Sequence, residues 1–317
     1  MIVFIYTVLV FLVLRFSVTL FNFLSNPKIG NYGRRFTDPV SIIIKVEKEQ
    51  EEADELLASI DAQDYTNLQI IIQSVDTPCS MDEVTGDYFL FLDANTNLKN
   101  GFIHSLVYRM KVFNLALLSV IPTHKNTGFL ANCVFPLSDF MLLNLFPLRL
   151  VRLVNHSIFA TVNESCMFFD AEMYRQFKWH KKTTRPLEIV RMIKQERLKA
   201  DVLLGNKLIC IEERLSESDF YLFGKRLMMN FNNHALVAFL YLVLVIGGPV
   251  VMVIELEPVF LVLPFGLIFL SRIMTSFLSA QKPVLNIILH PFQMLALFLL
   301  LVGQVWNKMF SLVAEKK

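Results

Sequence analysis

The sequence is poor in charge, in cysteine and in the short motifs that mark several enzyme classes. Only 18% of its 317 residues are charged, and the net charge of +2 argues against a nucleic-acid partner. The four cysteines are scattered without a CxxC pair or metal-site spacing, and we expect them to be buried, reduced thiols. The sequence has no Walker phosphate loop, no G-x-S-x-G motif and no HExxH motif. It therefore gives no support to the enzyme classes that depend on those motifs.

Hydrophobic residues, in contrast, are abundant. They make up 54% of the sequence, 29 residues are phenylalanine, and the mean hydropathy is +0.50. This composition rules out a disordered chain, a collagen-like chain and an ordinary soluble enzyme. It predicts a membrane protein that also carries a polar domain.

Four apolar stretches are candidates for membrane helices. The first, residues 2–24, is just long enough to cross a bilayer at a rise of about 1.5 Å per residue. A signal peptide is the alternative, but no basic segment precedes the apolar run, which favours a retained helix. The other stretches lie in the C-terminal third, at residues 235–254, 259–280 and 284–305. We predict a membrane helix over residues 1–24, a domain over residues 25–233, and a membrane bundle of about three helices over residues 234–317.

Two polar residues lie inside these apolar stretches. Arg15 is near the middle of the first, where snorkelling or a protein partner would reduce the cost of its charge. His290 precedes Pro291 in the last, and we interpret it as a polar group at a kink, bonded to a neighbouring helix. A transporter or lipid-binding bundle is a further hypothesis that rests on these two residues alone.

The charges between the apolar stretches predict the orientation of the chain. Basic residues follow the first stretch and lie in the last loop, whereas the middle loop is acidic (Lys28, Arg34 and Arg35; Arg272 and Lys282; Glu255 and Glu257). Cytoplasmic loops carry the excess of lysine and arginine. We therefore expect residues 25–233 to lie in the cytoplasm, at the plasma membrane.

The domain between the membrane segments has the pattern of an α/β fold. Short apolar, β-branched runs predict buried strands, and amphipathic segments between them predict helices (strands at 40–44, 68–72, 88–92 and 117–121; helices at 49–63 and 101–112). Strands that alternate with helices predict a parallel sheet. Residues 136–154 predict an interfacial helix with Arg149 and Arg152 toward lipid phosphates, or else a helix buried in the domain.

Four segments carry a resemblance to a known family. They read V-S-I-I-I at 40–44, Q-D-Y-T-N-L-Q-I-I-I at 63–72, G-D-Y-F-L-F-L-D-A-N at 86–95 and F-A-T-V-N-E-S-C-M-F-F-D at 159–170. Together they resemble the membrane-bound family 2 glycosyltransferases, and the helices at both ends are similar to the carotenoid and lipid glycosyltransferase branch. The resemblance implies a truncated GT-A-like domain, of the nucleotide-diphospho-sugar transferase type, with transmembrane helices. It also implies a nucleotide sugar held with Mg²⁺ or Mn²⁺ if the protein is active.

The family's metal-binding D-x-D motif aligns with Asp93 and Asn95. A second carboxylate is replaced here by a neutral amide oxygen, which is a weaker ligand for a hard cation. The pair is therefore a candidate metal site of reduced affinity. The alternative is that Asp93 and Asn95 only cap the turn after the strand.

Other elements of the family's catalytic machinery are also missing. An aspartate pair that holds the nucleotide aligns with Ser74 and Val75, and only 15 residues separate Ile72 from Tyr88, where the family has a further strand and helix. The carboxylate pair that supplies the general base aligns with Arg185 and Pro186. Glu188 is the candidate substitute base, or else an ordinary first-turn helix carboxylate.

These losses lead to two functional hypotheses. The first is a catalytically degenerate, family 2 glycosyltransferase-like membrane protein that acts as a partner or scaffold. The second is an active membrane enzyme that transfers a sugar from a nucleotide sugar to a lipid or carotenoid-like acceptor. The expected partners are the lipid bilayer and either another protein or a second copy of this chain.

Overall fold

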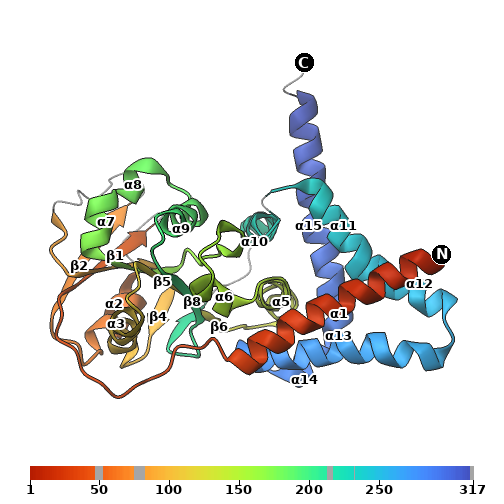
Figure 1. Ribbon diagram of the computed structural model, residues 1–317, viewed down its shortest axis with the longest axis horizontal. Helices are drawn as coiled ribbons and strands as arrows, with labels where there is room; N and C mark the ends of the chain where they lie inside the picture. The colour runs from red at the N-terminus through yellow and green to blue at the C-terminus, as the bar shows by residue number, and fades with distance from the viewer. Residues whose placement is uncertain (47–52, 75–82, 213–216, 232, 315–317) are drawn as a thin grey trace.

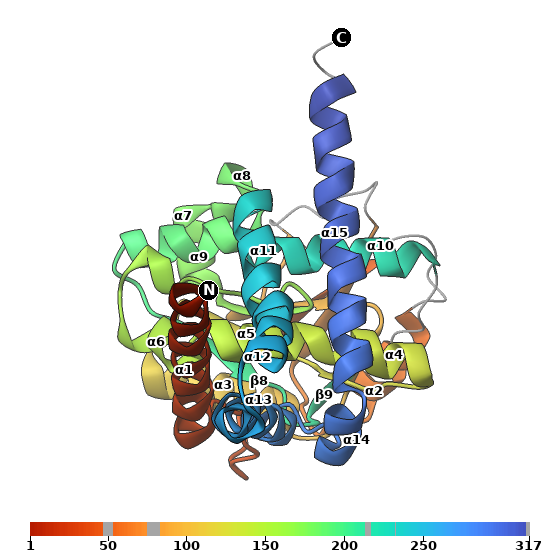
Figure 2. The same ribbon diagram turned by 90° about the vertical axis from the view of Figure 1, so that its right-hand side faces the viewer.

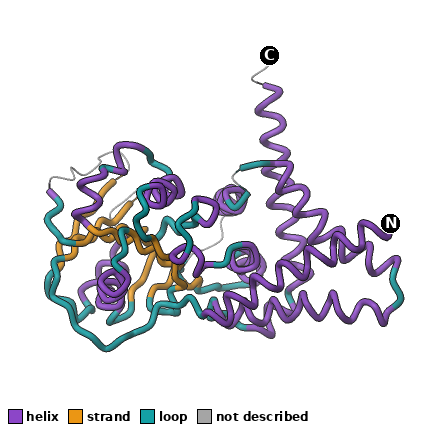
Figure 3. Tube along the Cα trace, in the orientation of Figure 1, coloured by secondary structure: helices purple, strands orange, loops and turns teal. Residues whose placement is uncertain are grey.

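The computed structural model describes residues 1–46, 53–74, 83–212, 217–231 and 233–314. Its strands are confined to one part of the molecule, and the other part consists of helices (Figures 1 and 3). The helical part combines the N-terminal helix with the C-terminal third of the chain, which lie side by side although they are far apart in sequence.

A six-stranded sheet forms the centre of the domain, in the order β2-β1-β3-β7-β5-β8. Its strands in chain order are β1 (Val40–Val46), β2 (Leu68–Ser74), β3 (Tyr88–Asp93), β5 (Leu117–Ile121), β7 (Cys166–Asp170) and β8 (Ala200–Leu204). The pairs β1–β2, β1–β3 and β5–β8 are parallel, and β7 is antiparallel to both of its neighbours. The four strands predicted from the β-branched runs are confirmed.

Helices cover both faces of this sheet, which explains why its strands are apolar on both sides. On one face, Ile42, Ile44 and Leu90 join a core with α2 (Asp54–Asp61) and α3 (Phe102–Phe113). On the other face, the alternate residues Ile43, Phe89 and Phe91 join a core with the helical segment that follows β7. That segment comprises α7 (Ala171–Phe177), α8 (Trp179–Lys182) and α9 (Pro186–Gln195). The helix expected over residues 49–63 begins at Asp54 in the described chain, and residues 49–52 lie outside it.

A smaller sheet extends the domain beside the ends of the main strands. It has the order β4-β9-β6, with β4 (Thr96–Leu98), β6 (Thr123–His124) and β9 (Ile209–Ile211). Strand β4 directly follows the turn after β3 and pairs antiparallel with β9. The turn that contains Ala94 and Asn95 is therefore fixed by sheets on both sides.

Strand β2 is an edge strand of the described sheet. Ile70 and Ile72 on this strand are 38% and 37% exposed, although apolar residues of the central strands are almost fully buried. The 15 residues between Ile72 and Tyr88 add no described strand or helix beyond β2. Residues 75–82 of this segment lie outside the described residues, so the truncation expected from the sequence stays a prediction.

Three helical segments of the described chain are long and apolar enough to cross a membrane. They are α1 (Ile2–Ser25), the segment Ala235–Glu255 and α13 (Pro258–Leu278). The second of these comprises α11 (Ala235–Leu242), a π-helical turn η4 (Val243–Gly247) and α12 (Gly248–Glu255). The outward faces of these helices expose many large apolar side chains, as a lipid-facing surface requires.

The stretch at 284–305 does not form one uninterrupted spanning helix. It is divided into α14 (Pro283–Ile288) and α15 (His290–Ala314), because the chain bends at Leu289. Helix α15 runs across the direction of α1 and α13 rather than along it (Figures 1 and 2). The apolar stretch expected at 284–305 is therefore divided between two helices.

The prediction of a single helix over residues 136–154 is wrong. The chain forms α5 (Pro136–Leu145) and α6 (Leu148–Leu153), separated at Pro147, which cannot continue a helix from the preceding turn. Helices α4 (Phe129–Val134) and η3 (Ser157–Phe159) flank them. Helix α5 and helix α10 (Glu217–Met229) both run across the direction of α1 (Figures 1 and 2).

The two arginines of α6 point into the protein and not toward lipid phosphates. The Nη1 atom of Arg152 lies 3.3 Å from the Oδ2 atom of Asp201, a fully buried carboxylate on β8. The Nη2 group of Arg149 donates to the carbonyl oxygen of Asn26 at the end of α1. Arg109 on α3 donates to the same Asp201 oxygen at 3.0 Å, so Arg152 is the second of two guanidinium groups that face this buried carboxylate.

Candidate functional site

The candidate site lies where the parallel strands β2, β1 and β3 end. Their carboxyl ends meet at one edge of the sheet, with Val46 opposite Ser74 and Lys45 opposite Asp93 in the strand register. In open α/β sheets, ligands bind outside the carboxyl ends of the strands. The structure thus brings the sequence-predicted positions Ser74 and Asp93 to the same edge, on either side of β1. Val75 lies outside the described residues.

Asp93 is held in a well-defined backbone environment. Its backbone N–H donates to the carbonyl oxygen of Ser165 at 3.2 Å, and its own carbonyl oxygen accepts from the Thr96 hydroxyl at 2.8 Å. The turn is therefore closed by Thr96, which the sequence reasoning missed, and not by the side chains of Asp93 or Asn95. No described residue donates a hydrogen bond to the Asp93 carboxylate, so this carboxylate is available to a ligand.

Cys166 lies beneath this edge and takes no part in ligand chemistry. It is fully buried on β7, opposite Leu92. Burial raises the pKa of its thiol, and the negative charge of Asp93 raises it further. Cys166 is therefore a neutral thiol, as are the other two described cysteines, Cys133 and Cys210, which are also free and buried. These three confirm the expectation for the cysteines, and Cys79 lies outside the described residues.

Lys45 changes the electrostatics of the edge. It stands beside Asp93 in the register of β1 and β3, and its side chain is exposed with Nζ 5.8 Å from the centroid of the Phe91 ring. An ammonium group at this place repels a divalent cation. Lys45 was visible in the sequence, but its alignment with Asp93 depends on the strand register.

The donor set at this edge does not by itself fit Mg²⁺ or Mn²⁺. Asp93 supplies one carboxylate and the exposed Asn95 supplies one amide oxygen, whereas such cations take about six oxygen ligands. Within the described ranges, no three His, Cys, Asp or Glu residues are grouped closely enough to hold a metal ion. Most of the ligands would have to come from water and from a diphosphate.

Glu188 lies in the first turn of α9, and its carboxylate is bonded to two neighbouring side chains. Its carboxylate accepts from the Thr183 hydroxyl at 3.2 Å and pairs with Nη1 of Arg185 at 3.4 Å. Arg185 is the N-cap residue and Pro186 occupies the first helical turn, where a proline is well tolerated. The geometry fits the alternative given for Glu188, a first-turn carboxylate favoured by the helix dipole.

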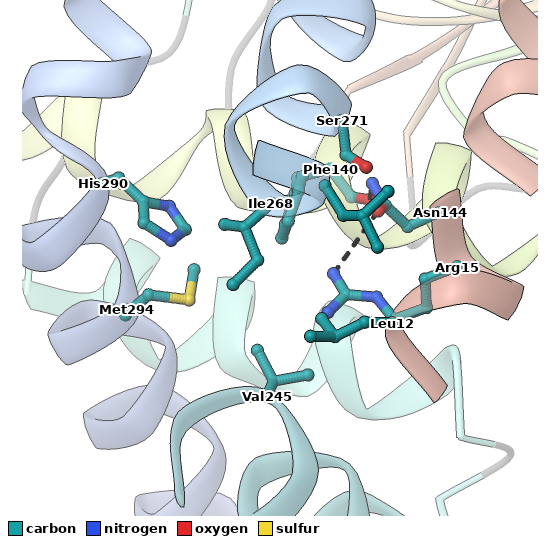
Figure 4. Close-up of a pocket in the computed structure, with 10 residues that line it drawn as sticks. Leu12, Arg15, Phe140, Asn144, Val245, Ile268, Ser271, His290 and Met294 are labelled. Atoms are coloured by element: carbon teal, nitrogen blue, oxygen red, sulfur yellow. Dashed lines mark hydrogen bonds between the residues drawn. The ribbon is translucent and has the colours of Figure 1, made fainter. Parts of the chain in front are cut away.

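A second polar cluster lies among the membrane helices, and the sequence reasoning recognised it only in part. Arg272 is not a loop residue, as the charge count assumed, but lies inside α13 and is 1% exposed. Its Nε–H donates to Nδ1 of His290 at 3.0 Å. The interpretation of His290 as a polar group bonded to a neighbouring helix is therefore confirmed. Arg15 faces the same region from α1 (Figure 4).

Comparison with known proteins places the fold. By sequence, no protein-family model matches the chain. No curated protein matches it either. By structure, it is similar to the mannosyltransferase PcManGT from Pyrobaculum calidifontis, solved in complex with GDP-Man and Mn²⁺. That match has a TM-score of 0.50 and 11% identity, and covers 96% of this chain and 99% of the other.

The fold is GT-A-like. It is a mixed α/β fold with a parallel sheet, as in that glycosyltransferase, combined with three candidate membrane helices. A second similar structure is S. aureus TarS 1-349 in complex with UDP-GlcNAc, with a TM-score of 0.38 and 10% identity over 85% of this chain and 92% of the other. The similarity to the mannosyltransferase confirms the predicted fold class.

Proposed function

We propose that the protein is a glycosyltransferase-like integral membrane protein whose domain has lost sugar transfer and acts as a partner or scaffold. The observation that carries the proposal is the composition of the sheet edge. There Asp93 has the amide of Asn95 as its neighbour along the chain and the ammonium of Lys45 beside it in the register. This edge has too little negative charge to hold a divalent cation and a diphosphate together.

Two further features support the loss of transfer. Glu188, the candidate base, is already bonded to Thr183 and Arg185, and these bonds occupy its two carboxylate oxygens. Strand β2 is the edge of the described sheet, and no described strand or helix lies beyond it to form the wall of a nucleotide pocket. The composition of the sheet edge weakens metal binding. The bonds of Glu188 weaken proton transfer, and the edge position of β2 weakens nucleotide binding.

The proposal includes the bilayer as a partner and the domain on its cytoplasmic side. The N-terminus and the α12–α13 connection lie at the same end of the molecule, away from the domain (Figure 1). That connection contains Glu257, whereas Lys28 and Lys282 lie near the domain ends of α1 and α13. Basic residues on the domain side and an acidic turn on the far side support this orientation.

Nucleotide-sugar binding tests the proposal. The full chain in detergent is melted with UDP-, GDP- and dTDP-sugars, each with and without Mn²⁺, and PcManGT with GDP-Man and Mn²⁺ serves as the positive control. A ligand at about 100 times its Kd stabilises a folded protein by about 2.7 kcal/mol. We expect no shift for this chain. A Mn²⁺-dependent shift with one nucleotide sugar would overturn the loss of function.

The second candidate is an active membrane glycosyltransferase with a lipid or carotenoid-like acceptor. Two observations favour it. No described residue donates a hydrogen bond to the Asp93 carboxylate, and the structurally similar mannosyltransferase was solved with GDP-Man and Mn²⁺. Under this candidate, Asp93→Ala removes any metal-dependent nucleotide binding. Unchanged binding in that variant would count against it.

A further inference from the structure

Two buried arginines lie among the membrane helices without an acidic partner. Arg15 on α1 is 6% exposed and Arg272 on α13 is 1% exposed. Neither forms an ion pair with an Asp or Glu of the described chain. A guanidinium stays protonated in proteins, and an uncompensated charge in such a place is costly. The region therefore has an excess of positive charge that the described side chains do not neutralise.

Aromatic contacts compensate for only part of this charge. The guanidinium carbons of Arg272 and Arg15 lie 3.5 Å and 5.0 Å from the centroid of the same ring, that of Phe140 on α5. Arg15 also faces the rings of Phe11 and Tyr241, each at 5.5 Å. Cation–π contacts stabilise a desolvated cation by less than the cost of burying two like charges together.

Hydrogen bonding is also incomplete. Nη2 of Arg15 reaches Oδ1 of Asn144 only at 3.4 Å, and Nε of Arg15 and Nη2 of Arg272 are buried without a partner. A buried donor that is left unsatisfied lowers the stability of the folded protein, because it has lost its hydrogen bond to water. These atoms are thus prepared for an acceptor that the protein does not supply.

His290 supplies a further donor because of Arg272. Arginine can only donate, so the Nδ1 atom of His290 accepts from Arg272 and the proton of the neutral ring is on Nε2. Arg272 in this way fixes the tautomer of His290 and places a positive charge behind it. The ring then presents an N–H group on its other side.

Arg15 and His290 both line a small cavity. It lies between α1, α5, α13 and α15, with Arg15, Asn144, Ser271 and His290 as its polar lining (Figure 4). The rest of the lining is apolar (Leu12, Phe140, Val245, Leu267, Ile268 and Met294). The space suits one or two oxygens of an anion, and not a whole sugar.

We propose that this cavity binds an anionic oxygen of a lipid phosphate, with Arg15 and His290 as donors and Arg272 as the positioning residue. Arginine is the residue of choice for phosphate, and the two positive charges match its negative charge. The lipid source follows from the surroundings, because Leu267 and Ile268 are partly exposed and Leu270 is 45% exposed on the outer face of α13. An acyl chain can lie on this face, whereas a free ion would have to cross it. The proposal is independent of whether the domain transfers sugar.

Thermal stability of the full chain in a neutral maltoside detergent tests the proposal. Phosphatidic acid, diacylglycerol and inorganic phosphate are titrated against the wild type, Arg15→Gln and the control Arg35→Gln, whose side chain is 82% exposed on the domain. We expect phosphatidic acid alone to raise the melting temperature of the wild type and the control. In Arg15→Gln, the half-saturating concentration should rise about tenfold or more, because a charge-assisted hydrogen bond is lost.

Other results would overturn the proposal. Equal affinity for phosphatidic acid in all three proteins would leave Arg15 a purely structural role. An equal effect of diacylglycerol, which has the acyl chains without the phosphate, would exclude a site for phosphate charge. A shift with inorganic phosphate alone would exclude the lipid as the source. If Arg15→Gln does not fold, the conservative Arg15→Lys gives the same test. Lysine keeps the positive charge but loses the Nε donor of arginine. The half-saturating concentration of phosphatidic acid should therefore be higher for Arg15→Lys than for the wild type.

Discussion

At the scale of single residues, the sheet edge differs from a metal site by two side chains. Asp93 is in place, but Asn95 is neutral and Lys45 is positive. We predict that Asn95→Asp raises the affinity for Mn²⁺ by about tenfold, because a carboxylate replaces an amide as ligand to a hard cation. Calorimetric titration of Mn²⁺ into the purified protein measures this change.

The matched control for this prediction is Asn67→Asp. Asn67 is exposed and precedes β2, so the substitution adds the same charge at the opposite edge of the sheet. If both variants bind Mn²⁺ equally, the gain is a general effect of charge, and the edge at Asp93 is no latent metal site.

At the scale of elements, the close contact between α1 and α12 depends on a glycine. A Cβ atom at Gly248 would lie 2.5 Å from a side-chain methyl of Val8, which is fully buried. We predict that Gly248→Ala destabilises the protein by about 1–3 kcal/mol, because the two helices must move apart. The loss is measured as a lower midpoint of thermal unfolding in detergent.

Gly266 on α13 provides the comparison for Gly248. A Cβ atom there meets nothing within 4 Å, so Gly266→Ala should leave stability unchanged or raise it by up to about 1 kcal/mol, since alanine is the better helix former. Equal destabilisation by both substitutions would contradict the role of the α1–α12 contact.

The elements also show what the sequence could predict. The strands were predictable because a run such as residues 40–44 needs only its own β-branched residues and burial on both faces. The break at Pro147 has an equally local cause, the proline itself, but the prediction of one helix over residues 136–154 missed it. The place of Arg272 was not predictable, because its burial depends on Phe140 and His290, which come from other helices. In the candidate site, the position of Asp93 at the end of its strand was predictable from the sequence. The proximity of Lys45 to Asp93 was not, because it depends on the register between β1 and β3.

At the scale of the whole molecule, the orientation of the helices in the membrane decides on which side the domain lies. The α12–α13 turn and the domain lie at opposite ends of the spanning helices (Figure 1). If the domain is cytoplasmic, Glu257 in the turn faces outward and Glu196, exposed after α9, faces the cytoplasm. Single cysteines at these two positions can therefore report the orientation, because the described native cysteines are buried.

We predict that, in intact cells, a membrane-impermeant maleimide labels Glu257→Cys but not Glu196→Cys, in a background that carries Cys79→Ser. After permeabilisation both should be labelled, which shows that each cysteine is accessible. The basic residues near the domain ends of α1 and α13 should hold this orientation, since they are retained on the cytoplasmic side. Labelling of Glu196→Cys in intact cells would place the domain outside the cell. The charge argument would then be wrong, although the fold would be unaffected.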